Sequence, residues 1–287
     1  MIANKEGLEY LKTIESDSID LVLTDPPYIT SKESGMNKWV QHVEEQNKTN
    51  AKDIKTPEEF VDHKTLEKWH QFFRTAKTHV KYWSKKYHTM KQDYLKYGSI
   101  YGEKYARVTD FGDWDRNFTL QKLDLFVSQF SRVLKKGGTA IIFFDLWKIS
   151  DLKKILEDNG FKQIRFIEWV KTNPQPLNSK TNYLTNCREV ALSAVKGGKP
   201  TFNSKYDNAI YEFPTQAGKN RFHPTQKSLA LFKALIEKHS NPGDVVLDPF
   251  LGAGTTAVAA KELKRNFVGC EIDEEFYKKS IDWLKKS

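Results

Sequence analysis

The sequence has little of what a secreted or membrane protein needs. It holds only two cysteines in 287 residues, Cys187 and Cys270, which lie far apart. This spacing suits neither a disulfide framework nor a metal site, so we expect a reducing compartment and no bound metal. The longest apolar run, 139–147, is interrupted by Asp145 and is too short to span a bilayer. No apolar leader segment is visible, and we expect a cytoplasmic protein without membrane contact.

Negative charge is also in the minority. The chain has 46 Lys and Arg against 37 Asp and Glu, a formal net charge of +9 and a pI near 9.2. A basic balance of this size favours a polyanionic partner, with nucleic acid first. Hydrophobic residues make up 39% of the chain, which is enough for a core and argues against global disorder. The length fits one large domain, or one domain with a substantial insertion.

Composition separates a middle block from the two blocks that flank it. Block 29–110 holds 16 Lys and Arg against 11 Asp and Glu, five of the seven histidines, and aromatic residues at helix-like spacings. We therefore predict a mainly helical insertion over 29–110, and one domain made of 1–28 together with 111–287.

Outside this insertion, helix and strand patterns alternate. A buried strand is predicted over 18–24, and two prolines stop it. In the last block the patterns predict strands over 139–144, 161–170, 190–195, 244–248 and 267–271, and helices over 119–135, 151–159, 228–239, 255–263 and 273–284. Lys136-Gly137-Gly138 is expected to end the first of these helices. Such alternation is typical of a doubly wound α/β fold with a mostly parallel sheet.

A glycine loop follows the strand 244–248. Gly252 and Gly254 allow the backbone to approach a ligand closely, and the N–H groups of the helix that follows favour polar ligand groups. Glu271 closes the next strand about 20 residues later, where a carboxylate commonly binds a nucleotide ribose. The loop lacks the lysine of a phosphate-binding P-loop, which disfavours ATP chemistry. The pattern predicts a nucleoside cofactor, and the alternative is an ordinary strand-to-helix turn.

The turn Asp25-Pro26-Pro27-Tyr28 carries a second set of chemical groups. The exocyclic amine of a base is a poor nucleophile, because its lone pair is delocalised into the ring. A carboxylate and a backbone carbonyl can hold the amine hydrogens, and a tyrosine ring can stack on a base that has left the duplex. Proline rigidity would preserve this geometry. The alternative is a simple strand-terminating turn.

Taken together, the two motifs resemble the amino-methyltransferase family of DNA modification enzymes. The resemblance is to the permuted branch, in which the catalytic turn precedes the cofactor loop. Four further segments are similar to that branch, namely 111–115 (Phe-Gly-Asp-Trp-Asp), 131–138, 169–176 and 223–228 (His-Pro-Thr-Gln-Lys-Ser). The resemblance covers 1–28 and 111–287.

The resemblance implies a circularly permuted, seven-stranded class I methyltransferase sheet with an antiparallel last strand pair, and S-adenosylmethionine as cofactor. It implies that Asp25, Pro26 and Tyr28, on a turn stiffened by Pro27, hold the target amine. The implied cofactor contacts are Asp248, Phe250, Gly252, Gly254 and Thr255, with Glu271 at the ribose and His223 and Thr225 near the methionyl group. The stretch from Ile2 to Gly7 departs from the family, which has a strand and a Gly-Asp pair there; the nearest acid here is Glu6.

DNA contacts are expected mainly in block 29–110. Only 197–221 remains between the segments in which this branch usually reads its site, and that is short for a recognition domain. We predict phosphate contacts from Arg74, Lys77, Lys81, Lys85 and Lys86, with further contacts from Lys199, Lys219 and Arg221. The alternative is a helical cap with its own small core and a solvated basic face.

The expected reaction is methylation of N6 of adenine in DNA, which would place the protein at the nucleoid. N4 of cytosine is the alternative target, but that subgroup more often has serine where Asp25 stands. Methylation at C5 of cytosine needs a cysteine, typically after proline, and neither Cys187 nor Cys270 fits. RNA and protein amine methyltransferases normally have the cofactor loop first, and a DNA-binding module without activity would not need both motifs intact. A cognate restriction endonuclease and a second copy of the chain stay open as partners.

Overall fold

The computed structural model describes residues 2–28, 88–89, 92, 118–174, 186–216, 221–223 and 225–287. The chain divides into two compact units, Met1–Ile29 with Asn117–Ser287, and Thr30–Arg116. All of the helices and strands that follow belong to the first unit. The predicted segment 111–115, the predicted DNA contacts from Arg74 to Lys86, and Lys219 lie outside the described residues.

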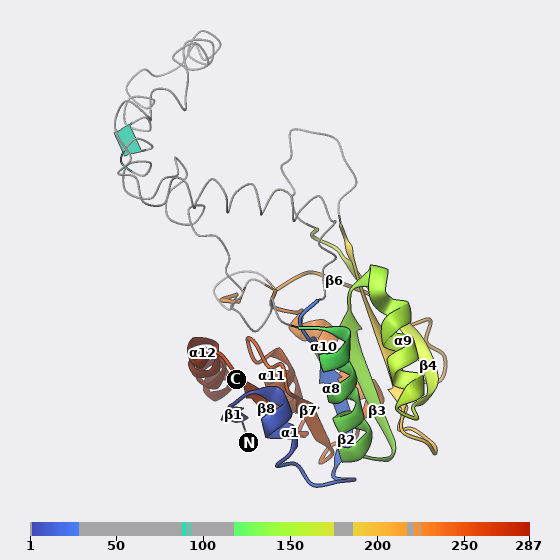
Figure 1. The fold of residues 1–287 in the computed structure, drawn as a ribbon. Helices are drawn as coiled ribbons and strands as arrows, with labels where there is room; N and C mark the ends of the chain where they lie inside the picture. The colour runs from blue at the N-terminus through green and yellow to red at the C-terminus, as the bar shows by residue number, and fades with distance from the viewer. Residues whose placement is uncertain are drawn as a thin grey trace. The chain divides into compact units, whose positions relative to one another are not determined.

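An eight-stranded sheet forms the centre of the first unit (Figure 1). The strand order is β1 (Ile2–Asn4), β8 (Asn266–Glu271), β7 (Val245–Asp248), β2 (Ile19–Thr24), β3 (Leu134–Phe144), β5 (Arg188–Val195), β4 (Lys162–Lys171) and β6 (Ile210–Phe213). All neighbours pair in parallel except β5, which is antiparallel to both β3 and β4. The mostly parallel sheet and its antiparallel member are confirmed.

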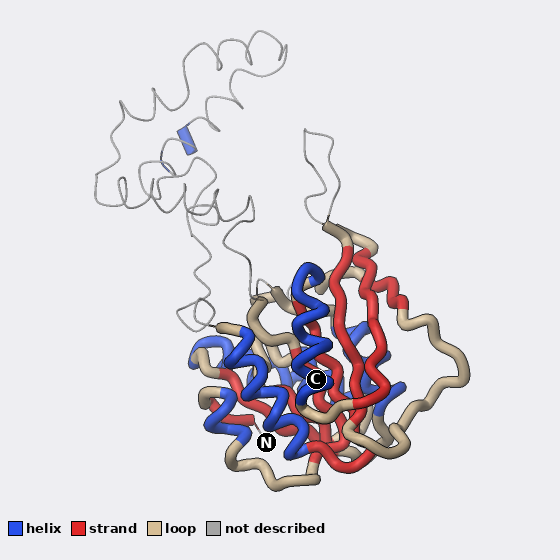
Figure 2. The backbone as a smooth tube through the Cα atoms, turned by 45° about the vertical axis from the view of Figure 1, so that its right-hand side comes forward, coloured by secondary structure: helices blue, strands red, loops and turns tan. Residues whose placement is uncertain are grey.

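Helices cover both faces of this sheet (Figure 2). On one face lie α1 (Gly7–Leu11), α8 (Leu120–Val133) and, after the short turn η1 (Leu146–Lys148), α9 (Ile149–Asp158). On the other face lie α10 (Leu229–His239) and α11 (Thr255–Glu262), while α12 (Glu274–Lys286) packs against α11, β1 and β8. The predicted doubly wound α/β architecture is therefore present.

Strand β2 shows why the central strands read as continuous apolar runs. Val22 packs into the core beneath α1, α8 and α9, whereas Leu21 and Leu23 pack into the core beneath α10 and α11. Successive side chains of a strand point to opposite faces, and both faces are covered here, so polar alternation disappears.

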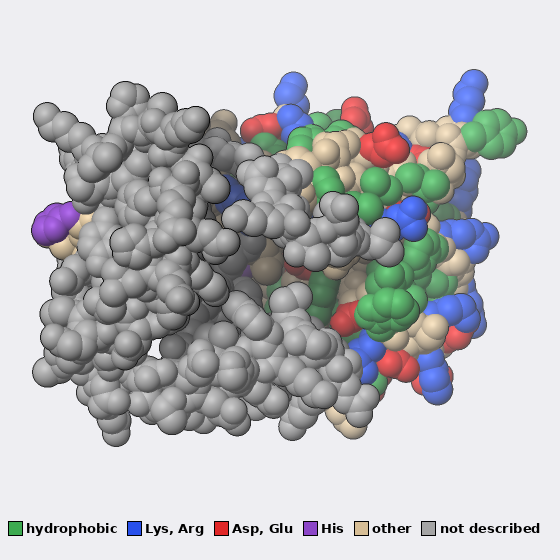
Figure 3. Space-filling view, turned by 90° about the horizontal axis from the view of Figure 1, so that it is seen from above, with side chains coloured by type: hydrophobic (Ala, Val, Ile, Leu, Met, Phe, Trp, Pro, Cys, Tyr) green, Lys and Arg blue, Asp and Glu red, His purple; other side chains and the backbone are tan. Residues whose placement is uncertain are grey.

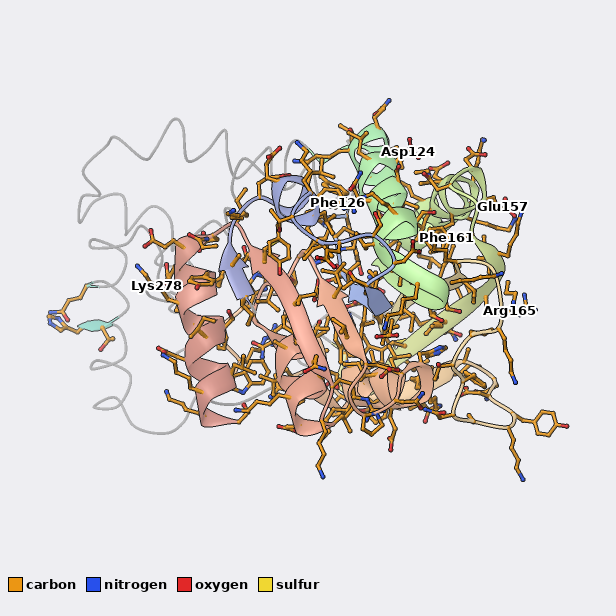
Figure 4. All side chains as sticks on the ribbon, turned by 90° about the horizontal axis from the view of Figure 1, so that it is seen from below. Asp124, Phe126, Glu157, Phe161, Arg165 and Lys278 are labelled. Atoms are coloured by element: carbon orange, nitrogen blue, oxygen red, sulfur yellow. The ribbon has the colours of Figure 1, made fainter. Side chains whose placement is uncertain are left out.

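Helix α8 is amphipathic and buries one stripe against the sheet. Its buried residues are Leu123, Phe126, Val127, Phe130 and Val133, which recur at helical spacing. Figure 4 shows Phe126 and Phe161 directed into the unit, whereas Asp124 and Glu157 project from the outer sides of α8 and α9. Thr119 begins the helix by accepting a hydrogen bond from the backbone N–H of Lys122 at 3.2 Å.

The boundary between α8 and β3 differs from the sequence prediction. The helix ends at Val133 and the strand begins at Leu134, so the glycines expected to end the helix belong to the strand. The backbone N–H of Gly137 donates to Lys196 O at 2.9 Å, and that of Lys196 donates to Gly138 O at 2.9 Å. These hydrogen bonds to the end of β5 satisfy backbone groups that would otherwise have bonded within a helix.

Two short edge strands and one short helix were not predicted. Strands β1 and β6 span three and four residues, and α1 spans five. Such lengths are too short for a periodic apolar pattern, and pairing with β8 and β4 determines them instead. The sheet has one strand more than the resemblance implied.

Among the described residues, no helix is long and apolar enough to cross a membrane.

Two leucines of α8 test whether this stripe holds the helix on the sheet. Leu123 is fully buried, whereas Leu125 is 56% exposed. We expect Leu123→Ala to lower the free energy of unfolding by about 2 to 5 kcal/mol, because it leaves a cavity. The same change at Leu125 should cost less than about 0.5 kcal/mol. Urea denaturation measures both, and equal losses would contradict the described orientation of α8.

Candidate active site

Sheet order brings the two sequence motifs together. Strands β2 and β7 are parallel neighbours, with Leu21 opposite Val246 and Val22 opposite Leu247. The turn after β2 and the glycine loop after β7 therefore leave the sheet at the same edge, although more than 200 residues separate them along the chain. The carboxyl edge of a doubly wound sheet is where such folds bind ligands.

Asp248, at the end of β7, joins the two motifs. One carboxylate oxygen accepts hydrogen bonds from Thr24 Oγ1 at 2.7 Å and from the backbone N–H of Phe250 at 3.0 Å. The other oxygen accepts from Thr256 Oγ1 at 2.5 Å. Protein groups thus occupy both oxygens of this fully enclosed carboxylate. These bonds fix the glycine loop against the end of β2, and the contact of Asp248 with the cofactor stays a prediction.

The glycine loop adopts a conformation that requires its glycines. Gly252 and Gly254 have φ of 53° and 88°, a region that other residues rarely adopt. A side chain at Gly254 would lie 2.9 Å from Ser280 Cβ, whereas one at Gly252 would meet only the ring of His223, 3.8 Å away at Nε2. Among the described residues, the ring of His223 is therefore the group nearest to a Cβ placed at Gly252. Close approach of a ligand to this loop is sterically feasible.

Glu271, at the end of β8, is fixed beside the loop. Its Oε2 accepts from the backbone N–H of Gly252 at 2.6 Å, and its Oε1 accepts from that of Asp273 at 2.9 Å. Burial raises the pKa of this carboxyl despite these two bonds. Each oxygen retains a second lone pair. The carboxylate is thus oriented, and it can accept two further hydrogen bonds such as those of ribose hydroxyls.

His223 presents a neutral ring to the loop. Burial, and next to it the charge of Lys227, lower the pKa of His223 to about 4, so the ring is uncharged at neutral pH. Nδ1 accepts a hydrogen bond from the backbone N–H of Thr225 at 3.3 Å, which places the ring proton on Nε2, the nitrogen that faces Gly252. The ring also packs edge-on against Phe276 at 4.3 Å between centroids. Thr225 therefore orients His223, whose ring lies at the loop, and the contact of both residues with the methionyl group stays a prediction.

The remaining predicted cofactor residues lie on the same loop. The Phe250 ring packs against Phe126 and Phe118 of the segment around α8, with centroids 4.5 and 5.6 Å away. Thr255 is the buried first residue of α11. The loop is thus anchored by aromatic packing on one side and by Asp248 on the other.

A buried ammonium group lies against the turn after β2. Lys227 Nζ is 2.8 Å from Asp25 Oδ2 and 2.5 Å from Glu189 Oε2. It also donates to the hydroxyl of Tyr28 at 3.3 Å, and that hydroxyl lies 3.4 Å from Glu189 Oε2. Lys171 pairs with the other oxygen of Glu189 at 2.6 Å. We refer to Asp25, Lys227, Glu189 and Lys171 as the charge chain.

The side chains of the charge chain shift one another's pKa values. Burial would raise the pKa of Glu189, but the ammonium groups of Lys227 and Lys171 outweigh burial and lower this pKa to about 2. Burial likewise opposes the charge on Lys227, yet Asp25 and Glu189 raise its pKa well above the usual value. The pKa of Asp25 is raised, because burial and the neighbouring Glu189 outweigh the attraction of Lys227. Burial, then Asp25, keep the Tyr28 hydroxyl protonated by raising its pKa.

The two carboxylate oxygens of Asp25 differ in their partners. Its Oδ2 pairs with Lys227, but its buried Oδ1 has no hydrogen-bond partner among the residues that the structure describes. Leaving a buried acceptor unpaired costs free energy, and native proteins rarely tolerate it without a function. This oxygen is therefore a candidate acceptor for a donor on a substrate.

Sequence reasoning missed Lys171, Glu189 and Lys227. Lys171 and Lys227 lie within segments that resembled the family, but no pattern indicated that their side chains meet. Glu189 is the second residue of β5, whose antiparallel insertion places it opposite Trp169 of β4. Only this topology brings the three side chains to Asp25, so sequence spacing carried no signal for it.

Two of the predicted DNA contacts lie among the described residues. Lys199 is exposed but follows the end of β5 that pairs with Thr139, at the amino edge of β3. This is the edge opposite Asp25, so Lys199 lies apart from the residues predicted to hold the target base, and its contact with DNA stays a prediction. Arg221 is exposed and lies two residues before His223, on the side of the site. Figure 3 shows basic side chains of the described part scattered among acidic ones rather than gathered into one patch.

The fold and the site together define a class of protein. A doubly wound sheet carries a glycine loop, a carboxylate one strand later, and a rigid turn with an unused carboxylate oxygen at the same edge. This combination is typical of class I methyltransferases that act on amino groups. A family model described as DNA methylase (N6/N4 methyltransferase) matches residues 19–282, and the chain belongs to this family.

Named relatives support the same assignment. The type II methyltransferase M2.DpnII of Streptococcus pneumoniae is 35% identical over 191 residues, which cover 59% of this chain and 70% of the relative. The type II methyltransferase M.HinfI of Haemophilus influenzae is 26% identical over 294 residues, which cover 96% of this chain and 65% of the relative.

Solved structures share the fold. The M1.HpyAVI–SAM complex has a TM-score of 0.56 at 25% identity, covering 99% of this chain and 98% of that one. The PvuII DNA methyltransferase, described as cytosine-N4-specific, has a TM-score of 0.60 at 14% identity, covering 98% and 84%. At that identity the second likeness concerns the fold alone.

The buried Asp248 predicts a distinct pH dependence of stability. Burial raises its pKa from 3.8 to about 6, although three hydrogen bonds favour the ionised form. The native state therefore takes up a proton before the unfolded chain does, and this group adds stability as the pH falls through about 6. We expect the change in the free energy of unfolding between about pH 7 and about pH 5 to differ by about 1 kcal/mol between wild type and Asp248→Asn.

Urea denaturation at several pH values measures this difference. Asp158→Asn is the matched control, because Asp158 is an exposed carboxylate on α9 that pairs with Lys154. Wild type should gain stability relative to Asp248→Asn as the pH falls, and the control should follow wild type. Parallel curves for wild type and Asp248→Asn would show that burial does not raise the pKa of Asp248.

Proposed function

We propose that the protein transfers the methyl group of S-adenosylmethionine to N6 of adenine in DNA, with the base flipped out of the duplex. The observation that carries this proposal is the buried Oδ1 of Asp25, which has no hydrogen-bond partner among the described residues and belongs to the same turn as Pro27 and Tyr28. Such a buried carboxylate oxygen can accept a hydrogen bond from an N–H group of a substrate. The exocyclic amine of a base is such a donor.

The turn supplies what amine methylation needs. Asp25 Oδ1 accepts one amine hydrogen and the backbone carbonyl of Pro26 accepts the other, which draws the nitrogen toward sp³ geometry and frees its lone pair. The ring of Tyr28 stacks on the base and offsets part of the cost of unstacking it. The lone pair would attack the methyl carbon of the cofactor, the thioether would leave with the electrons of the broken S–C bond, and the amine would release one proton to solvent. Such a direct transfer needs no covalent enzyme intermediate.

The glycine loop and its neighbours suit the cofactor, which supplies an electrophilic methyl group on a sulfonium. Gly252 and Gly254 allow the backbone to approach it, and Glu271 is oriented to accept the ribose hydroxyls. His223 is neutral at working pH, so its ring does not repel a positively charged sulfonium nearby. A charged imidazolium in that place would oppose binding.

Adenine is favoured over cytosine by the residue at the start of the turn. Asp25 is ionised more readily than a serine hydroxyl and is a stronger acceptor for amine hydrogens. Methyltransferases that act on N4 of cytosine more often have serine there. N4 of cytosine is the second candidate target, because the same acceptors would bind its amine.

DNA is the substrate of DNA methylases, and we infer two further partners, a restriction endonuclease and a second copy of the chain. The relatives M2.DpnII and M.HinfI are named type II methyltransferases, which supports a cognate restriction endonuclease that recognises the same site. A homodimer is compatible with this role. Its substrate would place the protein in the cytoplasm, at the nucleoid.

We further propose that the insertion 29–110 contacts DNA. It directly follows the turn that holds the target amine, and 16 of its residues are basic against 11 acidic ones. Arg74, Lys77, Lys81, Lys85 and Lys86 would contact phosphates, together with Lys219 and Arg221 of the later segment.

Labelled methyl transfer tests the function and the role of Asp25 together. We expect wild type to transfer label from S-adenosylmethionine to mixed-sequence duplex DNA, and nucleoside analysis to yield N6-methyladenine. Asp25→Ala should lower the rate by at least about 1000-fold, because the acceptor for the amine is removed. Its affinity for the cofactor should stay within about threefold of wild type, since Asp25 lies outside the glycine loop.

The alternative outcomes are separable. N4-methylcytosine as the product would retain the chemistry and overturn the choice of base. Label in RNA but not in DNA would overturn the substrate class. A fully active Asp25→Ala would remove the turn from the reaction altogether.

Salt dependence tests the role of the insertion. We expect a variant with Arg74, Lys77, Lys81, Lys85 and Lys86 all changed to Gln to bind DNA more weakly, regardless of sequence. The slope of log K against log salt should fall in magnitude by about 0.9 for each phosphate that the variant no longer neutralises. The matched control changes five lysines of α9 and α12 to Gln, namely Lys153, Lys154, Lys278, Lys285 and Lys286. Equal effects in both variants would reduce the role of the insertion to net charge.

A further inference from the structure

We propose that Lys227 is a positioning residue for methyl transfer, which holds Asp25 and Tyr28 in place and leaves Asp25 Oδ1 available for the target amine. The proposal rests on the function proposed above. The Lys227 ammonium donates to Asp25 Oδ2 at 2.8 Å and to the Tyr28 hydroxyl at 3.3 Å. One cation thus contacts both side chains assigned to the target base.

Glu189 holds this ammonium in position. It binds Lys227 at 2.5 Å through Oε2, and its other oxygen pairs with Lys171 at 2.6 Å. Lys171 is the last residue of β4 and Glu189 the second of β5, so two paired strands of the sheet carry this contact. The partner that places Lys227 is therefore itself held by the sheet.

Burial makes the charge on Lys227 effective over these short distances. The residue is 7% exposed, and its ammonium lies 5.3 Å from the centre of the Tyr28 ring and 5.5 Å from that of Phe143. Aromatic rings exclude water and tolerate a cation over their faces. Little solvent screens the attraction between Lys227 and the two carboxylates on either side of it.

The order of charges explains why Asp25 can act as an anion. Along the charge chain the signs alternate, negative at Asp25, positive at Lys227, negative at Glu189 and positive at Lys171. Without Lys227, two carboxylates would share one buried site, and they would not both stay ionised near neutral pH. A proton on Asp25 would occupy the oxygen that the amine needs.

Two titratable groups outside the charge chain also face Lys227. The Tyr28 hydroxyl accepts a hydrogen bond from Lys227 and stays protonated, and His223 lies within range of the Lys227 charge but is neutral. Neither can replace the ammonium as counterion to Asp25. The role of Lys227 is therefore specific to its charge and its place.

The experiment compares the pH dependence of kcat in wild type, Lys227→Met, Glu189→Gln and the double variant Lys227→Met/Glu189→Gln. Lys233→Met is the matched control, because Lys233 is a more exposed lysine of α10 that pairs with Glu262. Rates of methyl transfer to duplex DNA are measured from about pH 5.5 to about pH 9.5, with cofactor affinity and melting temperature alongside.

We expect Lys227→Met to lower kcat by at least about 100-fold near neutral pH and to move the acidic limb of the profile upward by at least about one unit. The double variant should move that limb back, because the second carboxylate is gone. Glu189→Gln alone should move it downward, because a negative neighbour of Asp25 is removed. Cofactor affinity should change less than kcat throughout, and Lys233→Met should match wild type.

Several results would overturn the proposal. An active Lys227→Met with the wild-type rate and profile would remove Lys227 from the reaction. A loss of melting temperature and cofactor affinity, with no movement of the acidic limb in any variant, would mean that Lys227 only holds the fold. If Lys227→Met does not fold, an unchanged limb in Glu189→Gln decides against the proposal and a downward shift supports it. Failure of wild type to methylate adenine would instead overturn the proposed function.

Discussion

Three hydrogen bonds to Asp248 connect the two parts of the site, and the arrangement of the site depends on them. Thr24, the residue before Asp25, bonds to the same carboxylate that holds Phe250 of the glycine loop and Thr256 of α11. A methyl group can pass only between partners at a fixed distance, and small displacements are costly in rate. The bonds of Asp248 link the end of β2 to the loop after β7.

The site concentrates buried carboxylates, and stability alone does not account for them. Asp25, Asp248 and Glu271 all have a raised pKa because burial disfavours their charge. Buried ion pairs seldom stabilise a fold more than apolar residues of similar size would. Such groups are retained where an oriented charge or acceptor has a task, which is why perturbed carboxylates gather at functional sites. Here Asp248 positions the loop, while Glu271 and Asp25 keep accepting capacity for ligands.

The sequence predicted those parts of the fold and site that depend on local pattern. The central strands, the long helices and both motifs follow from apolar periodicity and from prolines and glycines at strand ends. The edge strands β1 and β6 were not predicted, because they are too short to show a periodic apolar pattern. The bonds of Asp248 to Thr24 and Thr256 were not predicted, because a carboxylate at a strand end looks the same in the sequence whether it binds a ligand or a threonine. Lys227, Glu189 and Lys171 meet only through the antiparallel insertion of β5, a long-range contact without a local signal.

Sheet topology also explains why the order of the motifs along the chain does not matter to the chemistry. The turn after β2 precedes the loop after β7 by most of the chain, yet the strands are neighbours. At the other end of the order, α12 packs against β1, so the last helix and the first strand are neighbours as well (Figure 1). A connection could be moved from one place to another around such a layout without displacing Asp25 from the glycine loop. The chemistry therefore depends on the spatial order β7, β2, β3 and β5, which brings Asp248 and Glu189 to the same edge of the sheet as Asp25, and not on the order of these strands along the chain.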